Sequence, residues 1–167
     1  MAFELTTSGQ ERLREFLARC HDARAAMLPA LWLVQEEAGF ISDEAVEHVA
    51  RSLDVPVAEV FGVVTFYDMF KRRRLGRHHI QVCTNICCWL RGSMELLEYL
   101  KARLGIDVGG ITEDGNFSLG TVPCIGACGG APAMMIDLDY FEEMTPARVD
   151  EVLRSLKKDV AEPFRAP

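Results

Sequence analysis

Cysteine is the residue whose spacing in this sequence most directly indicates chemistry, because thiolates bind soft metal ions. Five of the six cysteines lie in two short stretches, Cys83-x4-Cys88 with Cys87 inside it, and Cys124-x3-Cys128. Each stretch directly follows a predicted strand, so the strand ends can bring the thiols together. A 2Fe-2S cluster takes two thiolates on each tetrahedral iron, which two loops with two cysteines each can supply. On spacing alone, Cys87 is as suitable a ligand as Cys88.

The glycines after the second stretch suit the same chemistry. Two ferric ions, two sulfides and four thiolates carry a formal charge of about −2, and burying that charge requires N–H donors around it. Gly126, Gly129 and Gly130 allow the backbone to turn its amides toward sulfur. A helix predicted to follow Cys88 would present its positive end to the same place.

Three other sites could use these side chains. A structural zinc site has the same tetrahedral geometry, but zinc ribbons mostly present C-x2-C pairs, which are tighter than both pairs here. A dithiol redox enzyme would need a C-x-x-C pair, which the sequence lacks. A Rieske centre would need a histidine in a ligand pair. His78 and His79 instead stand together before the first strand, where we expect them to face solvent.

Composition and charge restrict the class of partner. The 167 residues are 49% apolar, enough for one or two compact domains, and the net charge is −7. That acidity disfavours a nucleic-acid binder and favours a protein or small-molecule partner. The first residues resemble no secretory signal, so we expect a reducing cytosol, no disulfides, and membrane contact only through a partner.

The first part of the chain has the periodicity of helices. A capping pair of Ser8 and Glu11 predicts one helix start, and Gly39 predicts the end of a second helix. A third helix is expected after Ser42 and a fourth from Pro56. Residues 1–75 are therefore predicted to form a helical bundle.

The pattern changes to alternating strands and helices near residue 76, which predicts an α/β protein with a mixed sheet flanked by helices over 76–160. Residues 161–167 are expected to be a loose tail. The predicted order is a strand at Ile80-Gln81-Val82, a helix over Met94 to Leu104, strands at Phe117 to Val122, Ala133 to Ile136 and Tyr140-Phe141, and a helix from Thr145.

Two features near residue 70 could serve either the structure of the chain or an interaction with a partner. The basic run Lys71-Arg72-Arg73-Arg74 is typical of solvated loop charge, with docking as the alternative. Among the aromatic residues before it, Phe61 and Phe66 are predicted to be core, while Met69 and Phe70 remain open.

Several segments together resemble one known family, and they cover nearly the whole chain. They are Gln81-Val82-Cys83, Cys88-Trp89-Leu90-Arg91-Gly92-Ser93, Pro123-Cys124-Ile125-Gly126-Ala127-Cys128, Ala131-Pro132 and Gly62-Val63-Val64-Thr65-Phe66-Tyr67. In these segments the chain resembles the thioredoxin-like 2Fe-2S subunit of respiratory NADH:quinone oxidoreductase (complex I). NAD-reducing hydrogenases and NAD-dependent formate dehydrogenases contain the same subunit type.

The resemblance implies a thioredoxin-like domain that binds one 2Fe-2S cluster through Cys83, Cys88, Cys124 and Cys128. Such a chain would be a one-electron carrier without catalytic residues of its own, docked on a flavin subunit that binds FMN and NADH. It would lie on the cytoplasmic side of the membrane through the complex. In agreement, the sequence contains neither G-x-G-x-x-G nor G-x-x-x-x-G-K-[ST]. The remaining alternatives are a hydrogenase or formate dehydrogenase subunit, and a zinc-stabilised interaction module.

Overall fold

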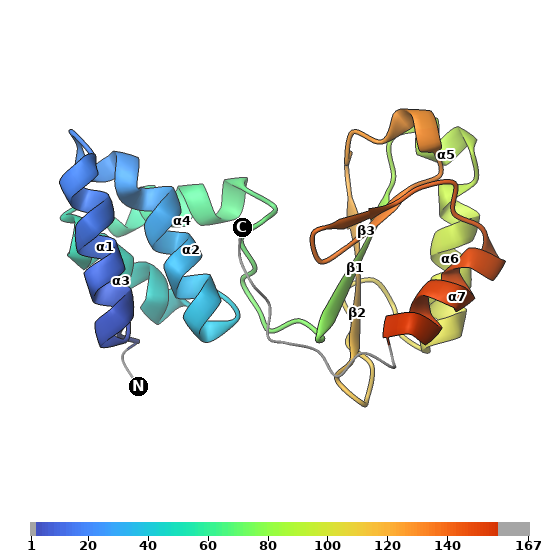
Figure 1. The fold of residues 1–167 in the computed structure, drawn as a ribbon, viewed down its shortest axis with the longest axis horizontal. Coiled ribbons are helices and arrows are strands. Elements are labelled where there is room, and N and C mark those ends of the chain that lie inside the picture. Colours follow the sequence, from blue (N-terminus) through green and yellow to red (C-terminus); the bar gives the residue numbers. More distant parts are fainter. Residues whose placement is uncertain (1–2, 157–167) are drawn as a thin grey trace. The chain divides into compact units, whose positions relative to one another are not determined.

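The computed structural model describes residues 3–156, which divide into two compact units, one up to Arg74 and one from Leu75 (Figure 1). The first unit is helical, and the second combines a sheet with helices. The predicted loose tail, 161–167, lies outside the described residues. No helix within 3–156 is long and apolar enough to cross a membrane.

The first unit packs its helices around one apolar core, which includes Leu31, Val46 and Val60. Gly39, with φ 78°, ends the second helix, and Ser42 caps the third by accepting a hydrogen bond from Ala45 N at 3.2 Å. Both predicted helix ends are therefore confirmed. The elements are α1 (Thr7–Arg19), the 3-10 turn η1 (Ala23–Ala26), α2 (Met27–Ala38), α3 (Asp43–Leu53) and α4 (Val57–Phe66).

The first helix begins two residues earlier than the predicted Ser8 cap. Thr6 is the N-cap, and its Oγ1 accepts a hydrogen bond from Gly9 N at 3.1 Å. The Thr6 hydroxyl also donates to Glu37 Oε1 at 2.6 Å. Because Glu37 lies on α2, this cap depends on a tertiary contact that local spacing does not reveal.

The prediction that Phe61 and Phe66 are core was wrong. Their side chains are 43% and 77% exposed, whereas Phe70, for which the sequence favoured neither position, is only 4% exposed. The fourth helix packs on the bundle through Val60 and Val64, one turn apart, so neighbouring positions point outward.

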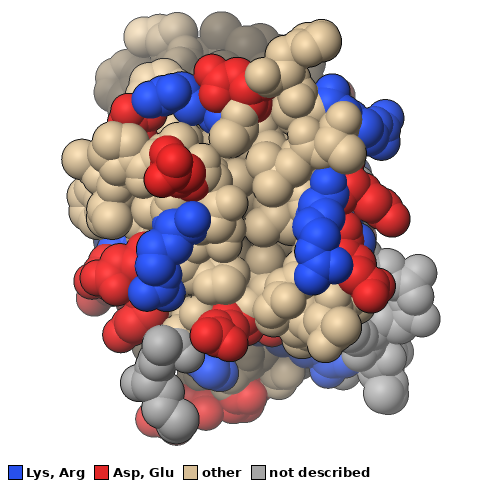
Figure 2. Space-filling model, turned by 90° about the vertical axis from the view of Figure 1, so that its left-hand side faces the viewer, with Lys and Arg blue, Asp and Glu red and all other residues tan. Residues whose placement is uncertain are grey.

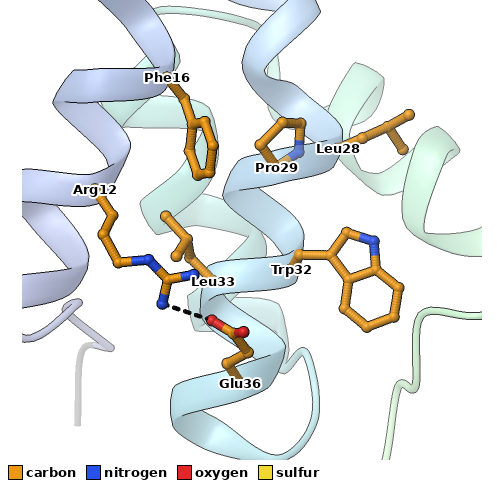
Figure 3. Close-up of a pocket in the computed structure, with 7 residues that line it drawn as sticks. All are labelled: Arg12, Phe16, Leu28, Pro29, Trp32, Leu33 and Glu36. Atoms are coloured by element: carbon orange, nitrogen blue, oxygen red, sulfur yellow. Dashed lines mark hydrogen bonds and ion pairs between the residues drawn. The ribbon is translucent and has the colours of Figure 1, made fainter. Parts of the chain in front are cut away.

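Helices α1 and α2 also border a surface pocket of about 290 Å³ (Figure 3). An ion pair between Arg12 Nη1 and Glu36 Oε2, 2.8 Å apart, joins the two helices beside it. Figure 2 shows one face of the helical unit, on which charged side chains border a central strip without charge. The apolar residues that line the pocket are Phe16, Leu28, Pro29, Trp32 and Leu33.

The second unit is built on a four-stranded mixed sheet with the order β2-β1-β3-β4. The central strand β1 runs parallel to β2 and antiparallel to β3, which pairs antiparallel with β4. Its elements are β1 (His78–Cys83), α5 (Ile86–Leu90), α6 (Ser93–Leu104), β2 (Phe117–Val122), η2 (Cys128–Gly130), β3 (Met134–Ile136), β4 (Asp139–Phe141) and α7 (Pro146–Leu156).

Helices α6 and α7 lie together beside the sheet (Figure 1) and share a core with β1, β2 and β3. Leu100 and Val149 contribute to this core from the helices, and Ile80 and Leu119 contribute from the strands. The predicted α/β class with a mixed sheet and flanking helices is confirmed.

His78 differs from its predicted solvent-facing position. It is 9% exposed, and its Nδ1 lies 2.9 Å from Asp137 Oδ2. Asp137 follows β3 with φ 56°, and its other carboxylate oxygen accepts from His79 N at 2.8 Å. The pairing of β1 with β3 brings this turn to the two histidines.

Candidate metal centre

The register of β1 and β2 brings the two cysteine stretches to one edge of the sheet. Cys83, the last residue of β1, is paired with Val122, the last residue of β2. The strands are parallel, so both following loops leave the sheet at the same end. Cys124 comes two residues after Val122 in the second loop, and Asn85 Nδ2 in the first loop donates to Pro123 O at 3.0 Å.

A third segment completes the site from the other side of β1. Cys83 N donates to Ala133 O at 3.2 Å, immediately before β3 begins. Cys128 starts the 3-10 turn that leads into this segment. The four predicted ligand cysteines therefore lie on two stretches of chain, and a third segment at Ala133 meets them at the end of β1.

The short helix α5 begins before the cysteines, not after them as predicted. Asn85 caps it by accepting a hydrogen bond from Ile86 N at 2.9 Å. Both Cys87 and Cys88 therefore lie in its first turn. The sequence had already signalled this start, because asparagine before a helical segment is a common N-cap.

The site is buried on one side and open on the other. Cys83 and Cys88 are each 2% exposed and form a small cluster with Ala131 and Ala133. Cys124 and Cys128 are exposed, and Cys87 is half-buried. A group held between these thiols would be shielded from water on the sheet side and accessible from the loop side.

Backbone N–H groups point at the thiols, as a buried anionic centre requires. Gly126 N donates to Cys124 Sγ at 3.4 Å, and Gly126 has φ +80°. The prediction that this glycine turns its amide toward sulfur is confirmed. Gly130 N instead donates to Ala127 O at 3.3 Å.

The pKa values of the two buried thiols are shifted in opposite directions. Burial raises the pKa of Cys83, but hydrogen bonds from the backbone N–H groups of Asn85 and Ile125, together with those from the thiols of Cys88 and Cys124, lower it, and the net pKa is lowered. Burial is also the largest influence on Cys88, whose pKa is raised despite a hydrogen bond from the N–H of Ala133. The sequence analysis did not predict these N–H donors, which are not on glycines. Their positions near sulfur depend on the fold and not on the residue type.

The same interactions show which thiols are neighbours. Cys83 interacts with the thiols of Cys88 and Cys124. A hydrogen bond with Cys87 is the main cause that raises the pKa of Cys128, which also interacts electrostatically with Cys124 and Cys83. All five thiols of the two stretches thus belong to one site.

This donor set fits an iron-sulfur cluster. A 2Fe-2S cluster requires thiolates in pairs, two on each iron, together with N–H donors to sulfur. The cysteine pairs and the amides directed at them supply both.

The fold and the site define an iron-sulfur protein of the ferredoxin type. The family model of thioredoxin-like 2Fe-2S ferredoxins matches residues 13–157, so the chain belongs to that family. It carries one 2Fe-2S cluster, and the predicted cofactor and family are confirmed.

Curated relatives match over most of their length, and they are named as subunits of NADH-quinone oxidoreductase. The chain is 41% identical over 137 residues to such a subunit from Rickettsia bellii, covering 81% of this chain and 82% of the relative. It is 40% identical over 148 residues to the corresponding subunit from Rhizobium meliloti, covering 89% of this chain and 88% of the relative.

A solved structure of similar fold is an NAD+-reducing NiFe-hydrogenase. The TM-score is 0.68 with 21% sequence identity, and the match covers 84% of this chain and 25% of the hydrogenase chain. This likeness shows that the arrangement of helices and sheet recurs in a second redox protein.

Proposed function

We propose that this chain is the electron-carrying subunit of an NADH-quinone oxidoreductase, with its 2Fe-2S cluster held by Cys83, Cys88, Cys124 and Cys128. The observation that carries the proposal is the meeting of two cysteine loops at the end of β1, where amides point at the thiols. Identity of about 40% with subunits of that enzyme supports the assignment to this complex.

Each part of the site has a role in this function. The four thiolates bind the irons, and the bound cluster accepts and releases one electron at a time. The amides of Gly126 and Ile125 stabilise the negative charge on sulfur without having to reorganise. Burial of Cys83 and Cys88 keeps water from the inner side, which protects the thiolates from exchange.

The outer side of α5 is suited to a redox partner. Ile86, Trp89 and Leu90 are 62%, 55% and 70% exposed on the helix that carries Cys87 and Cys88. Exposed apolar side chains grouped beside a redox site are typical of a protein contact. We assign this surface to the flavin subunit that binds FMN and NADH, so hydride chemistry takes place there and this chain receives single electrons.

The complex would hold the chain at the cytoplasmic side of the membrane. Purification of the native assembly tests this placement. Quinone-reducing membrane subunits are expected in it, whereas hydrogenase or formate dehydrogenase subunits would assign the chain to one of those related assemblies.

Metal content and spectra test the cluster itself. Protein purified without oxygen is expected to be reddish-brown, to contain two irons per chain, and to give a paramagnetic signal on reduction. A colourless protein with one zinc per chain would contradict the proposal and identify a zinc-stabilised module.

A further inference from the structure

Cys87 is the one thiol of the site that the proposed ligand set does not use. It lies in α5 immediately before Cys88 and is half-buried, whereas Cys128 is exposed on the second loop. A hydrogen bond joins the thiols of Cys87 and Cys128. The unused thiol is therefore in direct contact with a proposed ligand on the other loop.

Cys128 has a side-chain partner where the other three proposed ligands have backbone donors. The N–H of Gly126 donates to Cys124 Sγ at 3.4 Å. At Cys128 the interaction with the largest effect is the hydrogen bond with Cys87. The Cys87 thiol thus has the place that amides have at the other sulfurs. The remaining backbone donors are Asn85 and Ile125 for Cys83, and Ala133 for Cys88.

Binding of iron determines the direction of this hydrogen bond. A cysteine bound to iron is a thiolate, so Cys128 can then only accept. The proton between the two sulfurs stays on Cys87, because a second negative charge beside the first would be repelled. The site is also partly shielded from water, since Cys87 is half-buried and Cys88 is 2% exposed, and a hydrogen bond is stronger there than in water.

We propose that Cys87 acts on the cluster through Cys128, because its S–H donates to the Cys128 thiolate and thereby raises the reduction potential. Reduction adds one electron and no proton, so the negative charge on the ligand sulfurs increases. A donor at sulfur stabilises the reduced state more than the oxidised state, and hydrogen bonds to sulfur are among the factors that set such potentials. The inference rests on the proposed function, since it takes Cys128 and not Cys87 as the ligand.

Redox titration of the full chain with its cluster tests the proposal, and the paramagnetic signal measures the reduced fraction. Cys87→Val removes the donor at similar volume, whereas Cys87→Ser keeps a donor at smaller volume. At the potential where wild type is half reduced, Cys87→Val is expected to have a reduced-to-oxidised ratio about threefold lower, which is a midpoint about 28 mV lower for one electron. Cys87→Ser is expected within about twofold of wild type. Cys20→Val is the matched control, because it removes the other half-buried thiol that is not a proposed ligand, and it is expected to match wild type.

The infrared S–H stretching bands give a second readout, which a change in packing alone would not produce. Four of the six cysteines release their protons on binding iron, so the chain with its cluster is expected to show two bands, from Cys20 and Cys87. The band lost in Cys87→Val is expected at lower frequency than the band lost in Cys20→Val, because donation to a thiolate weakens the S–H bond. A Cys87 band at the same or higher frequency would contradict the hydrogen bond.

The outcomes of the titration separate this inference from the proposed function. A potential of Cys87→Val equal to that of wild type would overturn the inference and leave the proposed function intact. An equal fall in Cys87→Ser would also overturn it, since side-chain volume rather than the hydrogen bond would then set the potential. Loss of the two irons from Cys87→Val would instead overturn the proposed ligand set, because it would identify Cys87 as a ligand.

Discussion

Cys87 and Cys88 are adjacent residues with different surroundings. Cys88 is buried against Cys83 and Ala133, whereas Cys87 is half-buried and interacts with Cys128. Both lie in the first turn of α5, so the helix end favours either thiolate equally. Burial beside the first ligand therefore favours Cys88, in agreement with the family resemblance.

Single substitutions distinguish these two cysteines. Cys87→Ala is expected to retain two irons and the reduced-state paramagnetic signal, because Cys88 remains beside Cys83. Cys88→Ala is expected to lose the cluster or to hold it weakly through Cys87. Iron content and paramagnetic spectra of the purified variants measure this. The reverse pattern would mean that Cys87 is the ligand.

Gly126 supplies a second prediction at the residue level. It has φ +80° while its N–H donates to Cys124 Sγ, and a side chain in that conformation costs about 1–2 kcal/mol. Gly126→Ala is expected to release iron several times faster than wild type during chelator challenge. Gly129→Ala is the control, since a Cβ there also meets no atom within 4 Å and its φ is not in the left-handed region. Equal release rates for the two variants would contradict the role of this conformation.

Among the elements, the turn between β3 and β4 holds the far end of β1. Asp137 Oδ1 accepts from His79 N at 2.8 Å, and Oδ2 lies 2.9 Å from His78 Nδ1. A hydrogen bond to a charged group contributes about 1.5–3 kcal/mol net, and the two bonds together contribute near the upper part of that range here because the Asp137 side chain is 32% exposed. The turn therefore helps keep β1 and β3 in register, and β1 ends at the first cysteine.

Asp137→Ala is expected to lower the free energy of unfolding of the full chain by about 2–3 kcal/mol, because it leaves His78 without its carboxylate partner. Asp137→Asn should lose less, since an amide oxygen remains and asparagine tolerates φ 56°. Chemical denaturation followed by circular dichroism measures both. Asp139→Ala, an exposed aspartate on the same hairpin, is the control, and an equal loss there would contradict the argument.

For the whole molecule, the division into two units separates cluster binding from the helical region. Among residues 3–156, the cores of the second unit contain no residue before Leu75, and the single cysteine of the first unit is Cys20. We therefore propose that residues 1–75 form an assembly domain and 76–160 the cluster domain.

A truncated chain beginning at Leu75 is expected to fold and to bind two irons as the full chain does, because its cysteines and cores are complete. Iron content and the reduced-state spectrum, compared with those of the full chain, measure this. A truncated chain that is folded by circular dichroism but cannot hold the cluster would show that the helical unit contributes to the site.

The sequence by itself determined the features that depend on neighbouring residues. Gly39 and Ser42 mark helix ends because left-handed conformation and capping are local properties. The strand predicted at 80–82 and the helix predicted over 94–104 follow from periodicity, and the structure contains both with slightly wider bounds. The cysteine spacing likewise indicated a cluster, since the type of ligand and the number of residues between ligands are properties of the sequence itself.

Only the tertiary structure decided features that depend on distant partners. Phe66 is exposed because α4 uses Val60 and Val64 against the bundle, and helical periodicity cannot choose a face when every face is apolar. His78 is buried because the pairing of β1 with β3 brings Asp137 to it. The parallel register of β1 and β2 decides that the cysteine loops leave the sheet at one end. Hydrogen bonding between segments about 40 residues apart sets that register, and no local pattern contains it.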